Sequence, residues 1–237
     1  MAGRLDPGLA AEETRIKAAY ARRSNEDRYS WFTPGHLFMM QERERQVLAT
    51  LRREGVSSLK SKTILEIGCG TGYWLREFIK GGAEPGNITG LDVLPERVAL
   101  AKRLSPAGMR IECANAAETG LAPESFDLVV QSTVFTSILD AVARQQVALE
   151  MLRVLKADGL ILWYDFHVNN PSNPDVRGVN RRALADLFPT CRIKIRRLTL
   201  APPLLRRIAR YSWSLSHLLS QIPWLCTHHL AAIRKRR

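Results

Sequence analysis

Three glycines at alternate positions, with an acid just ahead of them, are the part of this chain best suited to chemistry. Residues 63–72 read Thr-Ile-Leu-Glu-Ile-Gly-Cys-Gly-Thr-Gly, so Glu66 precedes Gly68, Gly70 and Gly72. Glycine lets the backbone turn tightly and lets a ligand approach where a Cβ would clash. A helix that begins after such a turn directs its free N–H groups toward that ligand. Because the acid would repel a phosphate, the stretch favours a cationic or amino-bearing ligand.

The residues around this turn predict alternating strands and helices. Short apolar runs predict strands at residues 63–67, 87–92, 110–113, 126–131, 160–165, 191–200 and 227–233. Helix-forming residues and helical spacing predict helices at residues 10–23, 36–54, 72–80, 95–104, 140–155, 180–188 and 204–219. This alternation indicates βαβ units, and therefore an α/β fold with a mostly parallel sheet and helices on both faces.

Length and composition indicate one globular domain over residues 1–237. The chain is 46% hydrophobic and 24% charged, and its 237 residues suffice for a full core. No apolar signal segment is visible, and no run reaches the roughly 18 apolar residues of a spanning helix. Its four cysteines form no C-x-x-C pair. We therefore expect a cytoplasmic protein without disulfides or a metal site.

Positive charge is concentrated near the end of the chain. Residues 187–237 contain no Asp or Glu, but they contain eleven Lys and Arg residues. Subtracting these eleven charges from the net charge of +12 leaves +1 for residues 1–186. This asymmetry suggests an anionic partner, which could be nucleic acid, a lipid headgroup or a phosphorylated substrate. Within the domain we distinguish a helical cap (1–60), a core (61–166) and a C-terminal part (167–237) with a cationic, lid-like insertion (201–225).

Five motifs in order resemble the class I S-adenosylmethionine-dependent methyltransferases. The glycine turn at 64–72 is followed by Gly-Leu-Asp at 90–92, Cys-Ala-Asn-Ala at 113–116 and Phe-Asp-Leu-Val-Val at 126–130. The fifth, Glu-Met-Leu-Arg-Val-Leu-Lys-Ala-Asp-Gly-Leu, occupies residues 150–160. Nicotinamide-binding sheets use G-x-G-x-x-G instead. The resemblance covers residues 62–165 and implies a Rossmann-like sheet of seven strands, mostly parallel with the last antiparallel, and S-adenosyl-L-methionine as cofactor.

The resemblance implies that the glycine turn holds the methionine part of the cofactor. Gly68, Gly70 and Gly72 would allow the main chain to approach it. Glu66 would help to hold its amino group. Cys69 lies inside the turn, where we expect a small space-filling residue and no nucleophile, because no basic neighbour is visible to lower its pKa.

The later motifs would hold the rest of the cofactor. Asp92, about twenty residues after the turn, would accept hydrogen bonds from the ribose hydroxyls, although a helix N-cap would explain this residue alone. Asn115 and Ala116 would contact the adenine, where the family usually has Asp-Ala. Gln131, at the end of the fourth strand, would face the reacting sulfonium.

Methyl transfer to oxygen or carbon also requires a base near the carboxyl edge of the sheet. The candidates are Asp165 and His167, just after the fifth strand, and His36 in the N-terminal segment. A purely structural role remains open for each histidine.

The aromatic residues of the N-terminal segment are expected to help form the acceptor pocket. They are Tyr20, Tyr29, Trp31 and Phe32.

Several observations bear on the acceptor. Nucleic-acid amino methyltransferases of this fold often carry Asn/Asp-Pro-Pro-aromatic after the fourth strand, but residues 131–135 read Gln-Ser-Thr-Val-Phe. Short segments at 163–166, 169–171, 200–203 and 227–228 are similar to methyltransferases of bacterial glycan and secondary-metabolite clusters. We expect a small-molecule or lipid-linked acceptor, methylated at a sugar or natural-product hydroxyl. The alternatives are a quinone-modifying enzyme with the same cofactor and an RNA-associated cofactor-binding protein.

The cationic segment from residue 204 onward allows three interpretations. It could be a lid or a packed helix, a contact with the inner surface of a membrane, or an RNA-binding face. The oligomeric state is not indicated by the sequence.

Overall fold

The computed structural model describes residues 6–22 and 30–236, within which seven strands form one sheet. The strands are β1 (Ile64–Ile67), β2 (Ile88–Asp92), β3 (Arg110–Cys113), β4 (Phe126–Ser132), β5 (Leu155–Phe166), β6 (Cys191–Leu200) and β7 (Cys226–Lys235). Their order is β3-β2-β1-β4-β5-β7-β6, and β7 runs antiparallel to both β5 and β6. The predicted seven-strand sheet with an antiparallel last strand is therefore confirmed.

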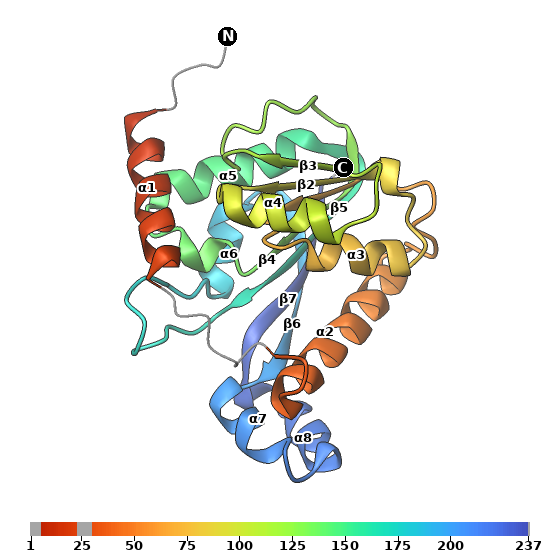
Figure 1. Cartoon of the computed structure of the whole chain (residues 1–237), viewed down its shortest axis with the longest axis vertical. Coiled ribbons are helices and arrows are strands. Elements are labelled where there is room, and N and C mark those ends of the chain that lie inside the picture. The colour runs from red at the N-terminus through yellow and green to blue at the C-terminus, as the bar shows by residue number, and fades with distance from the viewer. Residues whose placement is uncertain (1–5, 23–29, 237) are drawn as a thin grey trace.

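Helices cover both faces of this sheet (Figure 1). They are α1 (Pro7–Ala21), α2 (Pro34–Arg53), α3 (Tyr73–Lys80), α4 (Pro95–Leu104), α5 (Ala141–Val154), α6 (Arg181–Leu187), α7 (Pro202–Ile208) and α8 (Trp213–Ser220). Short 3₁₀ turns occur at Pro85–Asn87 (η2), Phe135–Ser137 (η3) and Pro223–Leu225 (η4). One apolar cluster joins α1, α5 and α6 to the sheet, and a second joins α2, α3 and α4 to the opposite face.

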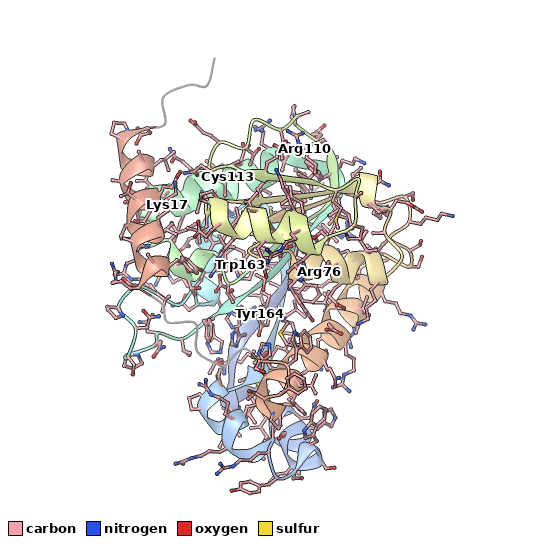
Figure 2. The ribbon with its side chains drawn as sticks, viewed as in Figure 1. Lys17, Arg76, Arg110, Cys113, Trp163 and Tyr164 are labelled. Atoms are coloured by element: carbon pink, nitrogen blue, oxygen red, sulfur yellow. The ribbon has the colours of Figure 1, made fainter. Side chains whose placement is uncertain are left out.

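Alternation along the strands produces these two clusters. Trp163 and Tyr164 are neighbours on β5 (Figure 2), yet Trp163 packs in the cluster of α5 and Tyr164 in that of α3. Successive side chains of a strand point to opposite faces, so a strand buried on both sides reads as a continuous apolar run.

The prediction of one helix over residues 204–219 is wrong. Helix α7 ends at Ile208, and α8 begins only at Trp213. Ser212 is extended, and its hydroxyl oxygen accepts a hydrogen bond from the backbone N–H of Leu215. A side-chain cap of this kind begins a new helix, which explains why helical spacing across the segment did not produce a single one.

The direction of the strands determines where a site can form. Strands β1 to β5 are mutually parallel, so the loops that follow them lie at one edge of the sheet. Because β6 also pairs antiparallel with β7, its carboxyl end lies at the same edge. Ligands of open α/β sheets bind at this edge. Within the described residues, no helix is sufficiently long and apolar to cross a membrane.

Candidate functional site

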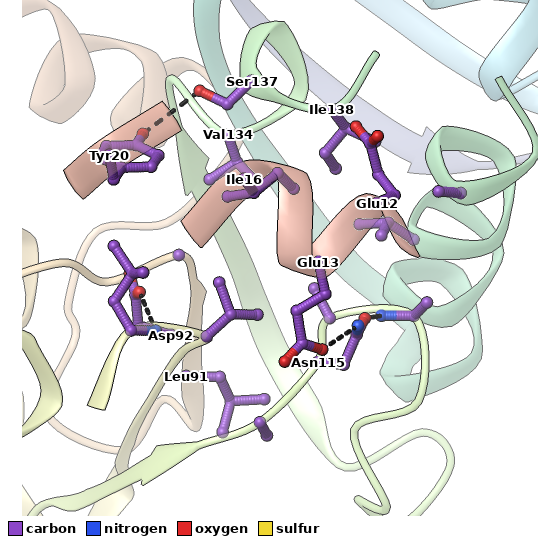
Figure 3. Close-up of a pocket in the computed structure, with 18 of the residues that line it drawn as sticks. Glu12, Glu13, Ile16, Tyr20, Leu91, Asp92, Asn115, Val134, Ser137 and Ile138 are labelled. Carbon is purple, nitrogen blue, oxygen red and sulfur yellow. Dashed lines mark hydrogen bonds between the residues drawn. The ribbon is translucent and has the colours of Figure 1, made fainter. Parts of the chain in front are cut away.

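A cavity lies at the carboxyl edge of β1, β2, β3 and β4. Its empty space is about 850 Å³, including the part that opens to solvent. Four of the residues predicted to bind the cofactor line it: Gly68, Asp92, Asn115 and Ala116. Ser132 at the end of β4, with Thr133 and Val134 in the loop that follows, contributes a further wall. Helix α1 covers the cavity (Figure 3). This volume is typical of small-molecule sites.

The glycine turn forms the floor of the cavity near β1. Gly68 has a φ of 65°, and a Cβ there would lie 2.4 Å from Val134 Cγ2. A side chain at this position would therefore collide with the loop after β4. The turn is joined to β2 because the N–H of Cys69 donates to the carbonyl of Leu91 over 2.9 Å.

Asp92 is held in place by two backbone groups. Its Oδ2 accepts from the N–H of Gly70 at 2.8 Å, and its Oδ1 accepts from the N–H of Leu94 at 3.0 Å. Burial raises the pKa of this carboxyl above its usual value, while the two N–H donors oppose that shift. Each carboxylate oxygen can accept more than one hydrogen bond. The carboxylate is therefore oriented toward the cavity with acceptor capacity left for a ligand.

Glu66 lies almost fully buried beneath the turn. One of its oxygens accepts from the backbone N–H of Leu75, but no described residue hydrogen-bonds its Oε2. Burial raises the pKa of Glu66 well above its usual value, while the positive charge of Arg43 opposes the shift. Buried polar atoms are normally paired. An unpaired carboxylate oxygen here indicates a missing cationic or N–H donor.

Arg43 of helix α2 carries the positive charge that opposes the pKa shift of Glu66. It is buried, and its guanidinium lies 5.0–5.5 Å from the ring centroids of Tyr73, Trp74 and Tyr164. Its Nη1 donates to the hydroxyl of Ser132 at 3.3 Å, whereas its Nε has no partner among the described residues. This region therefore holds a buried carboxyl group and a buried guanidinium, neither of which is among the described residues that line the cavity.

Sequence analysis did not predict a role for Arg43. The signal was present, because Met40, Arg43, Val47 and Leu51 follow helical spacing and are all buried. A charged residue on the apolar stripe of a helix needs a partner inside the protein.

Asn115 is already engaged in hydrogen bonds at the wall of the cavity. Its Oδ1 accepts from the N–H of Ala117 at 2.9 Å, and its Nδ2 donates to Glu13 of α1 at 2.7 Å (Figure 3). The side chain thus joins the loop after β3 to the helix that covers the cavity. Its predicted contact with a ligand stays a prediction.

Helix α1 is fastened over the cavity by polar contacts to the loop before α5. Glu12 accepts hydrogen bonds from the N–H groups of Leu139 and Asp140. The hydroxyl of Tyr20 lies 3.2 Å from that of Ser137 (Figure 3). Tyr20, predicted to bind substrate, also lines the cavity, together with the four residues predicted to bind the cofactor.

Gln131 and Cys69 lie just outside the cavity lining. Gln131 is fully buried; its Oε1 accepts from the N–H of Val134 at 3.1 Å, and its Nε2 has no partner among the described residues. Burial raises the pKa of the Cys69 thiol, so the group stays protonated and its nucleophilicity is low. Gly70 and Gly72 complete the turn behind them.

The structure separates the three candidate bases. Asp165 is fully buried, and its oxygens accept from the hydroxyl and N–H of Thr136 and from the N–H of Phe166. These contacts fasten β5 to the loop after β4, and they leave the catalytic role of Asp165 without geometric support. Burial raises its pKa to about 6.

His167 is partly exposed at the end of β5. Its Nε2 lies 2.9 Å from the carbonyl oxygen of Cys226, and its ring stacks on His229 with centroids 4.4 Å apart. A carbonyl only accepts, so Nε2 carries the hydrogen in the neutral ring and Nδ1 carries the lone pair. This tautomer has an available proton acceptor.

His36 lies buried at the start of α2. Its pKa is lowered, first by burial and then by the charge of Arg43, so the ring is neutral near pH 7. Trp31 contacts His36 edge-on at 5.8 Å and Tyr73 at 6.0 Å, whereas Phe32 is 96% exposed. Tyr29, predicted to bind substrate with them, lies outside the described residues.

The insertion at residues 201–225 contributes none of the described residues that line the cavity. It packs against α2 and β6 through Phe38, Leu200, Leu205 and Ala209. The helix that covers the cavity is α1. Within residues 6–22 and 30–236, no group of three or more His, Cys, Asp or Glu is placed to hold a metal ion.

Methyltransferases are among the curated proteins that match part of the chain. Arsenite methyltransferase of Mus musculus is 29% identical over 137 residues, which are 50% of this chain and 34% of that protein. Malonyl-acyl carrier protein O-methyltransferase of Bacillus cereus is 27% identical over 128 residues, which are 54% of this chain and 46% of that protein. The match therefore spans less than half the length of each relative.

Comparison with solved structures and with a family profile agrees with these matches. A crystal structure of a SAM dependent methyltransferase from Archaeoglobus fulgidus superposes with a TM-score of 0.57 at 19% identity, over 84% of this chain and 98% of that chain. A family profile described as a methyltransferase domain matches residues 64–159. Residues 64–159 thus match a methyltransferase domain, and the fold of the chain is that of a SAM dependent methyltransferase.

Proposed function

We propose that this chain binds S-adenosylmethionine in the cavity and transfers its methyl group to a hydroxyl of a small molecule. The bound cofactor supplies a methyl group already activated by the positive sulfonium. The protein's residues therefore have to align the acceptor, exclude water and remove a proton.

The residues of the cavity fit the adenosine part of this cofactor. Asp92 is oriented by Gly70 and Leu94 so that its remaining acceptor capacity serves the two ribose hydroxyls. Ala116 and the loop after β3 line the apolar side, where a flat base would lie under α1.

The single observation that carries the proposal is the pair Glu66 and Arg43. A buried carboxylate with one unpaired oxygen suits an ammonium, and a buried guanidinium with an unpaired N–H suits a carboxylate. The methionine part of the cofactor carries one group of each kind. A dinucleotide pyrophosphate would place its anion against Glu66 instead.

His167 is the base that the geometry favours. Its Nε2–H donates to the Cys226 carbonyl, so Nδ1 can accept the acceptor's proton. His36, neutral because of burial and Arg43, is the second candidate.

The class of acceptor follows from weaker observations. The Bacillus cereus relative is named for O-methylation of a malonyl group on a carrier protein and the mouse relative for arsenite, so related domains serve unlike acceptors. A hydroxyl of a sugar or natural product remains our proposal. A lipid-linked acceptor is a second candidate, favoured by the exposed apolar side chains of α8.

Calorimetric titration with S-adenosylmethionine and with its demethylated product tests the cofactor. Incubation with cofactor labelled at the methyl group then tests transfer to hydroxyl acceptors. Absence of cofactor binding would refute the whole proposal. Turnover without label in the acceptor would favour the quinone-modifying alternative, and salt-dependent RNA binding without any transfer would favour the RNA-associated one.

A further inference from the structure

Exposed apolar side chains gather on the segment from Tyr211 to Trp224. Of the thirteen large hydrophobic side chains exposed among the described residues, this segment contains six. Trp224 is 86% exposed, Tyr211 78% and Leu218 65%. We name these six the α8 face; its members are Tyr211, Trp213, Leu215, Leu218, Ile222 and Trp224. Such a patch on a protein surface marks an interaction site.

Helix α8 buries two serines on its inner side beside the partly buried Leu219, and leaves two leucines exposed. Ser216 is 0% exposed and Ser220 is buried, whereas Leu215 and Leu218 point away from the protein. The buried hydroxyls are satisfied locally, because Ser216 donates to the carbonyl of Ser212 and Ser220 donates to that of His217, each at 2.8 Å. A helix that faces water normally buries its apolar side. The exposed side of α8 is therefore partly apolar, with Leu215 and Leu218 beside Ser214 and His217.

The α8 face does not result from loose packing, because the segment that carries it is in close contact with α2. The ring of Trp213 meets Phe38 of α2 edge-on at 5.6 Å. At Gly35, a Cβ would lie only 3.0 Å from the Cα of Arg206, so α2 and α7 are in close contact. Figure 1 shows α7 and α8 together at the end of the molecule beyond β6 and β7.

Cationic side chains flank the α8 face. Arg206, Arg207 and Arg210 of the adjoining segment are exposed, and the guanidinium of Arg210 lies 4.6 Å from the ring centroid of Tyr211. Residues 187–237 contain no Asp or Glu that could neutralise them. An apolar face with Trp and Leu, flanked by arginines, has the chemistry of an element that lies in the headgroup region of a bilayer.

We propose that the α8 face docks this protein on the surface of an anionic membrane, with α8 lying along the interface. A second copy of the chain is a poorer occupant, because a two-fold interface would bring the two sets of arginines together. The carboxyl end of β6 leads directly into α7, so the docked face adjoins the edge of the sheet that holds the cavity. The proposal does not depend on methyl transfer.

Flotation of the full chain with vesicles tests this proposal. Vesicles of phosphatidylcholine with phosphatidylglycerol should carry the protein upward, and binding should weaken as salt is raised. Vesicles of phosphatidylcholine alone should bind it much less. Replacing the three arginines by glutamine should weaken binding about fivefold for each charge removed.

Leu218→Asp tests the apolar part, with Leu149→Asp as the matched control, because both leucines are exposed on helices. We expect Leu218→Asp to reduce vesicle binding by at least about tenfold and the control to leave it unchanged. Circular dichroism and cofactor affinity should be the same for both variants. Absence of flotation at low salt, or equal binding by the two variants, would overturn the proposal. Light scattering that shows a lipid-free dimer abolished only by Leu218→Asp would also overturn it, in favour of a second copy.

Discussion

Replacing Glu66 by glutamine should weaken cofactor binding while leaving the fold intact or more stable. The substitution keeps the acceptor for the N–H of Leu75 but puts an amide donor where the unpaired Oε2 now lies. That amide cannot accept from an ammonium. A hydrogen bond to a charged group contributes about 1.5–3 kcal/mol, so we expect roughly 10- to 150-fold weaker binding in calorimetry.

The pH dependence makes this prediction specific. Burial raises the pKa of Glu66 well above 4.5 in the cofactor-free protein, so a cationic ligand must displace a proton at lower pH. Wild-type affinity should fall by up to about tenfold per pH unit as pH drops below that raised pKa, and Glu66→Gln should lose this dependence. Titrations in buffers of different ionisation enthalpy measure the released proton.

The same substitution should change the stability of the cofactor-free protein in the direction opposite to its effect on cofactor affinity. The folded chain retains a proton on Glu66 that the unfolded chain releases near pH 4.5, so the stability from this group is lost as pH rises through the raised pKa. At neutral pH the cofactor-free Glu66→Gln variant should therefore unfold at an equal or higher temperature than wild type. Glu118→Gln, at an exposed position, is the control. If Glu66→Gln binds the cofactor with wild-type affinity and an unchanged pH profile, the assignment of Glu66 to the amino group is refuted.

Three further substitutions test the rest of the site. Asp92→Asn should weaken cofactor binding about tenfold or more, since a charged acceptor becomes neutral; unchanged affinity in calorimetry would remove the ribose assignment. His167→Ala should slow methyl transfer about 10²- to 10⁴-fold with cofactor affinity unchanged, and full activity would exclude it as the base. For Asp165, whose pKa of about 6 lies above its usual 3.8, stability is lost as pH rises through about 6. Urea unfolding across this range should therefore show wild type losing up to about 3 kcal/mol relative to Asp165→Asn; parallel pH curves would contradict the buried-carboxyl argument.

Local pattern was sufficient to predict most of the fold. The segments β3, β6 and α4 have the bounds that sequence analysis predicted. At the ends of each segment the residues change the periodicity of apolar side chains, which marks the boundary between two elements. Cofactor-site residues could be proposed for the same reason: Gly68 directly follows β1 and Asp92 ends β2, and parallel strands bring such positions to one edge.

The same local reading failed where packing decides the outcome. Residues 204–219 carry helical spacing throughout, yet the cap at Ser212 divides them into two helices. The second helix buries Ser216 and leaves Leu218 exposed. The spacing of apolar residues predicts which side chains share a face of a helix. It does not predict whether that face packs against the rest of the protein or stays exposed.

By itself the sequence determined the order of the strands and helices, the glycine turn, the acids beside it and the concentration of positive charge near its end. These depend on neighbours within a few residues, where periodicity and glycine conformation are decisive. Only the tertiary structure brought Arg43 of α2 within electrostatic range of Glu66 of β1, placed α1 over the cavity and left the α8 face uncovered. Those contacts join segments far apart in the chain, and their formation depends on how whole elements pack and not on any short stretch of residues.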